Sequence, residues 1–323
     1  MTTAFVHDAY PEPPVGAPGS PGAPGVPATA GRRILGVLRH DRAALFSASF
    51  IALMVLMALC APLISALTGH GPTAFDTSAI DVDSGGLPKE SFGGISAEHP
   101  LGVEPLNGRD VLARIAYGAR VSFLIAVSAT VLTTLLGVVL GMVAGFYGGW
   151  VDQVVSRVMD FLMAFPALIF MIAILSTLPA GNRSYLLVAV ISVFGWPYLA
   201  RVVRGQTLTL LNRDFVEAAR ASGASRRALV FKEILPNLRS SLIVMTTLAV
   251  PGYIGTEAGL SFLGVGVSPP TPSWGQMIAS SVSWYAVDPL YFAIPGLFLF
   301  LTVLSLTVLG DRVRAATDAG EAA

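Results

Sequence analysis

Apolar runs about as long as a membrane is thick recur along this chain, and they constrain its fold more than any other feature. A helix needs roughly 20 mostly apolar residues to cross the hydrocarbon layer, where backbone groups find no partner outside the helix. The composition agrees, because 54% of the 323 residues are hydrophobic, only 12% are charged and the mean hydropathy is +0.69. We predict an all-α membrane protein with six transmembrane helices, at residues 43–67, 122–147, 154–178, 184–203, 238–260 and 288–310.

The segment before the first apolar run has a different composition. Residues 1–42 contain the run PEPPVGAPGSPGAPGVPATAG, which offers little apolar surface to bury. The segment is also too long and too rich in proline and glycine for the charged start of a signal peptide. We predict a disordered tail.

Basic residues are concentrated on one side of the predicted spans. Of the 20 Lys and Arg residues, 15 fall in the tail, beside the 147–154 turn, in the loop between the fourth and fifth spans, and after the sixth span. Loops rich in Lys and Arg stay in the cytoplasm. We therefore predict that both termini are cytoplasmic.

The loop between the fourth and fifth spans, DFVEAARASGASRRALVFKEILPN from Asp214, has the pattern of two short helices. Asp214 precedes Glu217 by three residues, which is the spacing of a capping box. We expect Asp214 to cap a first helix that ends near residue 222, and Gly223 to supply the turn.

The second short helix has its own start and end. Ser225 is placed to cap it, and Pro236 is expected to end it. Phe231, Ile234 and Leu235 then fall on one apolar face. Such a pair of helices fits either the groove of a partner protein or an anionic membrane surface.

Four stretches of the chain resemble one protein family. EAARASGASRRALVFKEILPN is similar to the EAA loop of the membrane subunits of binding-protein-dependent ATP-driven importers. The C-type permease of the peptide (dipeptide, oligopeptide and nickel) branch is resembled by HPLGVEPLNGRDVLARIAYGARVS from His99, EAGLSFLGVGVSPPTPSWGQM from Glu257 and LGDRVRAATD from Leu309. The resemblance implies the type I ABC importer transmembrane fold, multi-pass in the cytoplasmic (plasma) membrane of a prokaryote.

The same resemblance implies a division of the chain. The expected parts are a disordered cytoplasmic tail (1–42), a first transmembrane helix (43–67), an extracytoplasmic loop (68–119), a type-1 transmembrane core (120–311) with the cytoplasmic EAA loop (205–237), and a cytoplasmic C-terminal tail (312–323).

In that family the EAA loop transmits movement from ATPase subunits. The resemblance implies that residues 214–223 form the coupling helix, with Glu217 at the ATPase surface or the turn, and with Gly223 setting the angle between the helices. The implied coupling residues are Asp214, Glu217, Ala218, Ala219, Gly223, Ile234, Leu235 and Pro236. The implied partners are a second (B-type) permease subunit, two ATPase units that are separate or fused, an extracytoplasmic substrate-binding protein, and membrane lipid.

Enzyme chemistry and nucleic-acid binding are not indicated. The 323 residues contain no G-x-x-x-x-G-K-S/T phosphate loop, so we expect ATP and Mg to bind to partner ATPase subunits and no cofactor to bind here. A net charge of +0 argues against nucleic acid. Cys60 is the only cysteine, and the four histidines are scattered along the chain, so we predict no catalytic residues and no metal site.

Glu257 is the clearest ionisable residue inside a predicted span. An ionisable group at membrane depth is costly and usually faces a cavity or a partner. Two interpretations remain open: Glu257 faces the translocation path, or it forms hydrogen bonds at the outer interface. Gly252, Gly255 and Gly259 beside it favour close helix packing.

Three smaller expectations concern the spans and their ends. Arg157 and Asp160 are three residues apart on a predicted helix and are expected to form an ion pair. The segment 268–277 is too polar to span and is expected to form a re-entrant or interfacial cap. An interfacial aromatic belt is expected from Trp274, Trp284 and Tyr285.

The resemblance implies import of short peptides, with nickel chelates, glutathione or oligosaccharides as alternative cargo. A membrane scaffold that recruits a cytosolic protein without transport is the alternative from another class. The insert at residues 69–98 either docks the extracytoplasmic binding protein or is only a surface loop.

Overall fold

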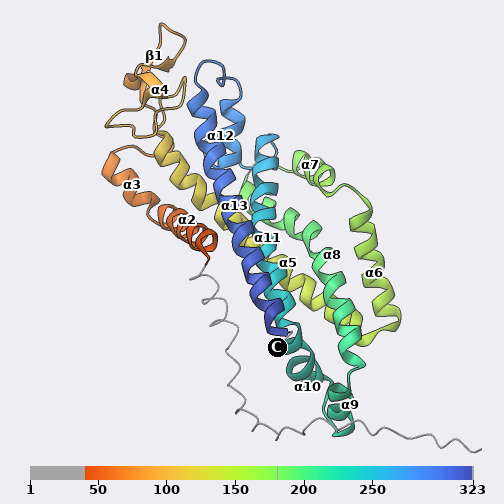
Figure 1. Ribbon diagram of the computed structural model, residues 1–323. Helices are drawn as coiled ribbons and strands as arrows, with labels where there is room; N and C mark the ends of the chain where they lie inside the picture. Colours follow the sequence, from red (N-terminus) through yellow and green to blue (C-terminus); the bar gives the residue numbers. More distant parts are fainter. Residues whose placement is uncertain (1–40, 180, 322–323) are drawn as a thin grey trace, which may run out of the picture.

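Long helices form a bundle, and a smaller folded segment sits at one end of it (Figure 1). The computed structural model describes residues 41–179 and 181–321, so residues 1–40 of the predicted tail lie outside the described residues. Within these described ranges, five helices are long and apolar enough to cross a membrane, and a bent helix pair makes a sixth candidate. The five include α2 (Arg42–Leu59), α5 (Val111–Tyr147), α8 (Arg183–Leu211), α11 (Leu235–Phe262) and α13 (Pro289–Glu321).

The first predicted span, 43–67, consists of two helices. Asp41 caps α2, because its carboxylate accepts two backbone N–H groups of the first turn at 2.8 and 3.3 Å. The helix α2 ends before Cys60, and a separate helix, α3 (Ala61–Thr68), follows. Pro62, in the first turn of α3, has no N–H with which to extend the hydrogen bonds of α2.

Residues 69–110 fold into a small unit that we call the inter-helix subdomain. Its β1 and β2 pair antiparallel, with Ile80 opposite Pro88. The predicted loop 68–119 ends too late, because α5 already begins at Val111, after a side-chain cap from Asp110. The elements of the subdomain are η1 (Thr77–Ala79), β1 (Ile80–Asp81), β2 (Leu87–Pro88) and α4 (Ser91–Gly94).

Buried charged and hydrogen-bonding side chains connect this subdomain to α5 and α13. The carboxylate of Glu104 accepts hydrogen bonds from Arg109 Nε and from the hydroxyl of Tyr291 on α13. Arg114 Nε on α5 lies 3.7 Å from the same carboxylate, and Arg114 also donates to Gln276 Oε1 at 2.8 Å. Glu104, Arg109, Arg114 and Tyr291, which we call the Glu104 cluster, are all at least nine-tenths buried. Buried charges persist only when paired, so the cluster fixes the position of the subdomain.

The helices α5 and α8 are in close contact along a row of glycines. Gly137, Gly141 and Gly145 are spaced by four residues and face α8. A Cβ atom on Gly141 would lie 2.5 Å from the carbonyl oxygen of Ala200, and one on Gly137 would lie 2.9 Å from Leu199 Cβ. These three positions, which we call the glycine seam, allow two backbones to approach more closely than larger residues would permit.

The third predicted span, 154–178, is broken rather than continuous. The structure has α6 (Gly149–Ala164) and α7 (Ala167–Thr177), bent by 86° at a short break. Phe165 is extended because the α conformation is disfavoured before Pro166, and Pro166 supplies no N–H to a continuing helix.

The ion pairs of α6 connect it to α8. Asp160 accepts from Arg201 at 2.6 Å, and Asp152 accepts from Arg204 Nη2 at 2.6 Å. The predicted pair of Arg157 with Asp160 is therefore wrong. The carboxylate of Asp160 reaches across to the neighbouring helix instead of along its own.

The segment after α11 contains a short buried helix, α12 (Trp274–Ser281), which packs against α5, α11 and α13. Trp274 is 0% exposed, and its Nε1 donates to the carbonyl oxygen of Ile115 at 3.2 Å. Its placement in an interfacial belt is therefore wrong, because a partner for its N–H is available inside the bundle. Tyr285 is exposed, as an interfacial position requires.

The outer faces of the bundle are apolar. On α5, large aliphatic side chains recur every three or four residues and are exposed in the single chain. Such a face suits hydrocarbon or a second membrane subunit. The exposed residues on this face include Leu124, Val127, Val131 and Leu135.

Candidate functional site

A short exposed helix stands at the end of the bundle opposite the inter-helix subdomain (Figure 1). This helix, α9 (Asp214–Ala221), is followed by α10 (Arg226–Ala228). Val216 is 0% exposed, and α9 contacts α8 and η2, while most of the other residues of α9 are exposed. The exposed residues include Asp214, Glu217 and Ala218.

The turn after α9 has the chemistry that the sequence predicts. Gly223 has φ of +84°, in the left-handed region that favours glycine. Ser225 then caps α10, because its hydroxyl accepts the N–H of Ala228 at 3.2 Å. Both local predictions, the turn at Gly223 and the cap at Ser225, are confirmed.

The predicted cap at Asp214 is wrong by one residue. Arg213 is extended and occupies the capping position, with its carbonyl oxygen accepting the N–H groups of Val216 and Glu217 at 3.0 and 3.1 Å. Asp214 is the first residue of the helix. Its negative charge still suits this site, because the amino end of a helix carries partial positive charge.

The predicted end of the second helix at Pro236 is also wrong. A π-helical turn, η2 (Leu229–Ile234), joins α10 to α11, and the N–H of Leu235 donates to Val230 five residues back. The missing N–H of Pro236 falls in the first turn after this wider segment, so the helix continues into α11. The π turn also shifts the register, and Phe231 is exposed rather than packed on the predicted apolar face.

Behind α9, the start of α11 is fixed in the bundle. Ile234 and Leu238 are each 1% exposed and pack in one cluster with Met142 of α5 and with Leu199 and Val203 of α8. The helix α9 contacts α8 and η2, which both contribute side chains to this core. A force applied to α9 therefore reaches the packed core through these two elements.

A groove of about 750 Å³ runs along the same helices, lined by α5, α8, α11 and α13. Hydroxyl groups are prominent among the lining residues, including those of Thr134, Tyr198, Ser241 and Thr256. Hydroxyls donate and accept hydrogen bonds, so this lining suits a polar solute that carries both kinds of group.

Glu257 does not line this groove. It is 0% exposed, and its two carboxylate oxygens accept hydrogen bonds from Ser122 and Ser261, both at 2.7 Å. In this conformation Glu257 is buried and hydrogen-bonded inside the chain, and its place on the translocation path stays a prediction. A Cβ atom on the nearby Gly252 or Gly255 would meet no atom of a neighbouring element within 4 Å, so close packing does not explain these glycines within this chain.

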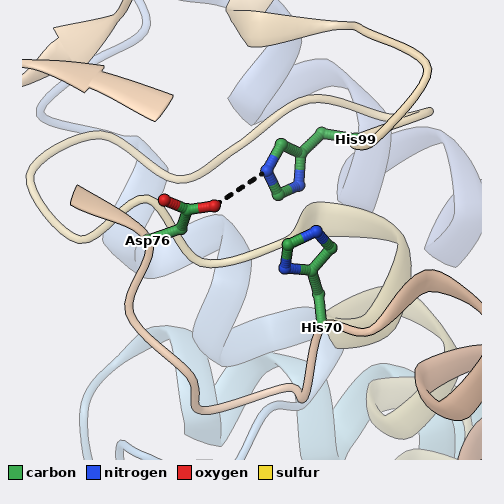
Figure 2. Close-up of side chains that lie close together, drawn as sticks. All are labelled: His70, Asp76 and His99. Carbon is green, nitrogen blue, oxygen red and sulfur yellow. Dashed lines mark ion pairs between the residues drawn. The ribbon is translucent and has the colours of Figure 1, made fainter. Parts of the chain in front are cut away.

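Sequence spacing missed one group of side chains. His70, Asp76 and His99 are up to 29 positions apart in the chain, yet their ligand atoms lie within 4.8 Å of one another in the inter-helix subdomain (Figure 2). The three residues lie in separate loops, so they do not have the sequence spacing of histidines one helical turn apart.

Comparison with known proteins identifies the family. Residues 137–320 match the family described as the binding-protein-dependent transport system inner membrane component. The chain belongs to this family. Residues 29–83 of the permease match the N-terminal TM domain of oligopeptide transport permease C.

Three curated relatives resemble the permease to the same degree. Each is 36% identical over 280 residues, covering 86 to 87% of this chain and 86 to 88% of the relative. They are the di/tripeptide transport system permease protein of Pseudomonas aeruginosa, the oligopeptide transport system permease protein of Bacillus subtilis and the glutathione transport system permease protein of Salmonella typhimurium.

A solved structure supports the fold. The permease resembles a chain of the MetNI methionine ABC transporter in an inward-facing conformation, with a TM-score of 0.51 and 20% identity. The match covers 63% of the permease and 96% of the other chain. The predicted type I importer fold is confirmed.

Proposed function

We propose that the permease forms one half of the pathway by which an ATP-driven importer moves short peptides across the cytoplasmic membrane. The observation that carries this proposal is the placement of α9, which is mostly exposed and contacts α8, one of the helices that line the groove. A push on α9 then changes the shape of the groove without contact between the ATPase and the cargo.

In this proposal α9 is the coupling helix. Glu217 and Ala218 face the ATPase groove, and Asp214 contributes charge at the amino end of the helix. Gly223 sets the angle, and the remaining coupling residues connect α9 to the bundle. These are Ala219, Ile234, Leu235 and Pro236.

ATP and Mg bind to two partner ATPase units, since the 323 residues contain no phosphate loop. The apolar outer faces contact lipid and a second, B-type permease subunit, and an extracytoplasmic binding protein delivers the cargo. The permease itself acts as a transport subunit rather than an enzyme.

The orientation follows from charge. In the sequence, 15 of the 20 Lys and Arg residues fall in segments that the order of the spans assigns to the same side as the loop containing α9, so we propose that this loop and both termini are cytoplasmic. The inter-helix subdomain is then extracytoplasmic, where a binding protein docks. The domain division expected from the sequence applies with α5 starting at Val111.

Short peptides are the cargo class that the names of the three relatives have in common. Proteins named for di/tripeptides, oligopeptides and glutathione match equally well, and glutathione is itself a tripeptide. A peptide backbone carries both donors and acceptors, which the hydroxyl groups of the groove complement.

The test measures uptake of labelled di- and tripeptides by cells that carry the complete importer. Glu217→Arg reverses the charge on α9 and is expected to abolish ATP-dependent uptake while the permease still accumulates in the membrane. Asp311→Arg makes the same reversal on an exposed residue in the carboxyl-terminal part of α13 and is expected to retain uptake. Normal uptake by Glu217→Arg would contradict the coupling role.

Cargo is tested separately with the unaltered importer. Unlabelled dipeptides, tripeptides, glutathione, nickel chelates and oligosaccharides compete in turn for uptake. Competition by peptides supports the proposed class, and competition only by a metal chelate or an oligosaccharide excludes it.

A further inference from the structure

Three loops of the inter-helix subdomain bring potential metal ligands to one point (Figure 2). His70 follows α3, Asp76 precedes η1, and His99 lies in the segment that leads to α5. Each offers one ligand atom, and all three atoms lie within 4.8 Å of one another.

The contact of Nδ1 of His99 with Asp110 orients the ring so that Nε2 can bind a metal ion. The Nδ1 atom lies 2.9 Å from Asp110 Oδ2, and Asp110 Oδ1 accepts the N–H of Ala113 at 2.6 Å. Because an ionised carboxylate only accepts hydrogen bonds, Nδ1 carries a proton, which leaves Nε2 as the ring nitrogen that can bind a metal ion. A histidine that donates one N–H to a carboxylate while its other nitrogen binds a metal ion is the usual arrangement at zinc sites.

The Nε2 atom of His99 is buried and without a hydrogen bond. The residue is 3% exposed, and among the described residues Nε2 makes no hydrogen bond. It lies 3.4 Å from Asp76 Oδ2. Two ligands bound at about 2.0–2.2 Å to one tetrahedral ion are separated by about 3.4 Å, so this spacing fits a shared ion.

Asp76 is held in place by its other oxygen and by its backbone. Oδ1 accepts from the N–H and the hydroxyl of Ser78 at 2.9 and 2.5 Å, which leaves Oδ2 toward His99. The Asp76 N–H donates to Asn107 at 3.2 Å. A Cβ on Gly108 would lie 1.8 Å from the Asp76 carbonyl oxygen, so only glycine allows this approach.

His70 completes the group from the other side. Its ring centroid is 4.3 Å from that of His99, and the two planes are tilted by 37°. A proton on His99 would satisfy Asp76 alone, whereas a metal ion also uses the nitrogen of His70. The set of two imidazoles and one carboxylate suits Zn²⁺, and Mg²⁺ and Ca²⁺ prefer oxygen ligands.

We propose that His70, Asp76 and His99 form a zinc site that joins the end of α3 to the start of α5. Three protein ligands leave one coordination position for water. The ion would link three separate segments of the subdomain: the segment that follows α3, the residue before η1, and the segment that leads to α5. This inference concerns the subdomain alone and does not depend on the cargo.

The test uses the full-length permease in detergent, purified through a tag without histidine and stripped with a chelator. Titration with ZnCl₂ alone, followed by calorimetry and elemental analysis, is expected to give one ion per chain and a raised unfolding temperature. MgCl₂ is expected to give neither. Co²⁺ is expected to show the visible absorption of a tetrahedral site.

His70→Gln and Asp76→Asn are each expected to weaken zinc binding by at least about tenfold. Asp83→Asn, an exposed carboxylate in the same subdomain, and His40→Gln are expected to bind as the unaltered chain does. Two ligand variants are used so that, if one of them fails to fold, the zinc affinity of the other still tests the site. Weak, non-stoichiometric zinc binding by the unaltered permease, or full binding by a folded ligand variant, would overturn the proposal.

Discussion

Removal of the Glu104 carboxylate is expected to destabilise the permease strongly. Glu104 is 3% exposed and accepts from Arg109 and Tyr291, with Arg114 3.7 Å away. Glu104→Ala leaves buried guanidinium groups without their counter-charge, and breaking a buried pair in this way costs about 3–5 kcal/mol. For a chain of this length, one kcal/mol corresponds to about 2 °C of unfolding temperature. The expected decrease is therefore about 8 °C.

The assay is thermal unfolding followed by tryptophan fluorescence in detergent, which the four tryptophans permit. Tyr291→Phe is the smaller perturbation, since it removes one hydrogen bond to a charged group, worth about 1.5–3 kcal/mol. The double variant Glu104→Met with Arg109→Met removes charges of both signs and is expected to recover part of the loss. A decrease for Glu104→Ala no larger than that for Tyr291→Phe would refute the assignment of the cluster as a buried ionic anchor.

Three further outcomes are expected. Gly141→Leu places a side chain where even a Cβ would lie 2.5 Å from a backbone oxygen of α8, so size-exclusion profiles in detergent should show loss of the folded permease. Gly223→Val forces a branched residue to φ of +84°, at a cost of about 1–2 kcal/mol, so uptake should fall while membrane insertion, measured by immunoblot of membranes, is unchanged. Burial raises the pKa of Asp288 above its ordinary value, so its ionisation costs stability as pH rises. Asp288→Asn should therefore gain unfolding temperature relative to the unaltered chain near neutral pH, and the two curves should converge in acid.

Much of the fold could be predicted from the sequence because apolar length determines what crosses a membrane. The apolar runs at 184–203, 238–260 and 288–310 predicted spans whose bounds lie close to or within α8, α11 and α13. The break at Pro166 was harder, because a proline inside a span is compatible with either a kink or a complete bend. Only packing against neighbouring helices decides between them.

Contacts between distant segments account for the other errors. Arg157 and Asp160 fit an ion pair along one helix, but the sequence does not show that Arg201 lies closer to Asp160 in space. In the sequence, Trp274 has the features of an interfacial residue. The sequence does not show that the carbonyl oxygen of Ile115 lies within hydrogen-bonding distance of its Nε1 inside the bundle. In the candidate site, Gly223 and Ser225 were predictable because turn and cap chemistry are local.

The glycine seam also determines how motion can travel through this molecule. A 37-residue helix such as α5 is about 55 Å long, well beyond the thickness of the hydrocarbon layer. One end of α5 carries Arg114 beneath the inter-helix subdomain, and the seam locks the other end to α8, which leads directly to α9. The helix α5 therefore connects the inter-helix subdomain to the end of the bundle near α9 as one continuous element, so that a displacement at either end can pass to the other without an intervening joint.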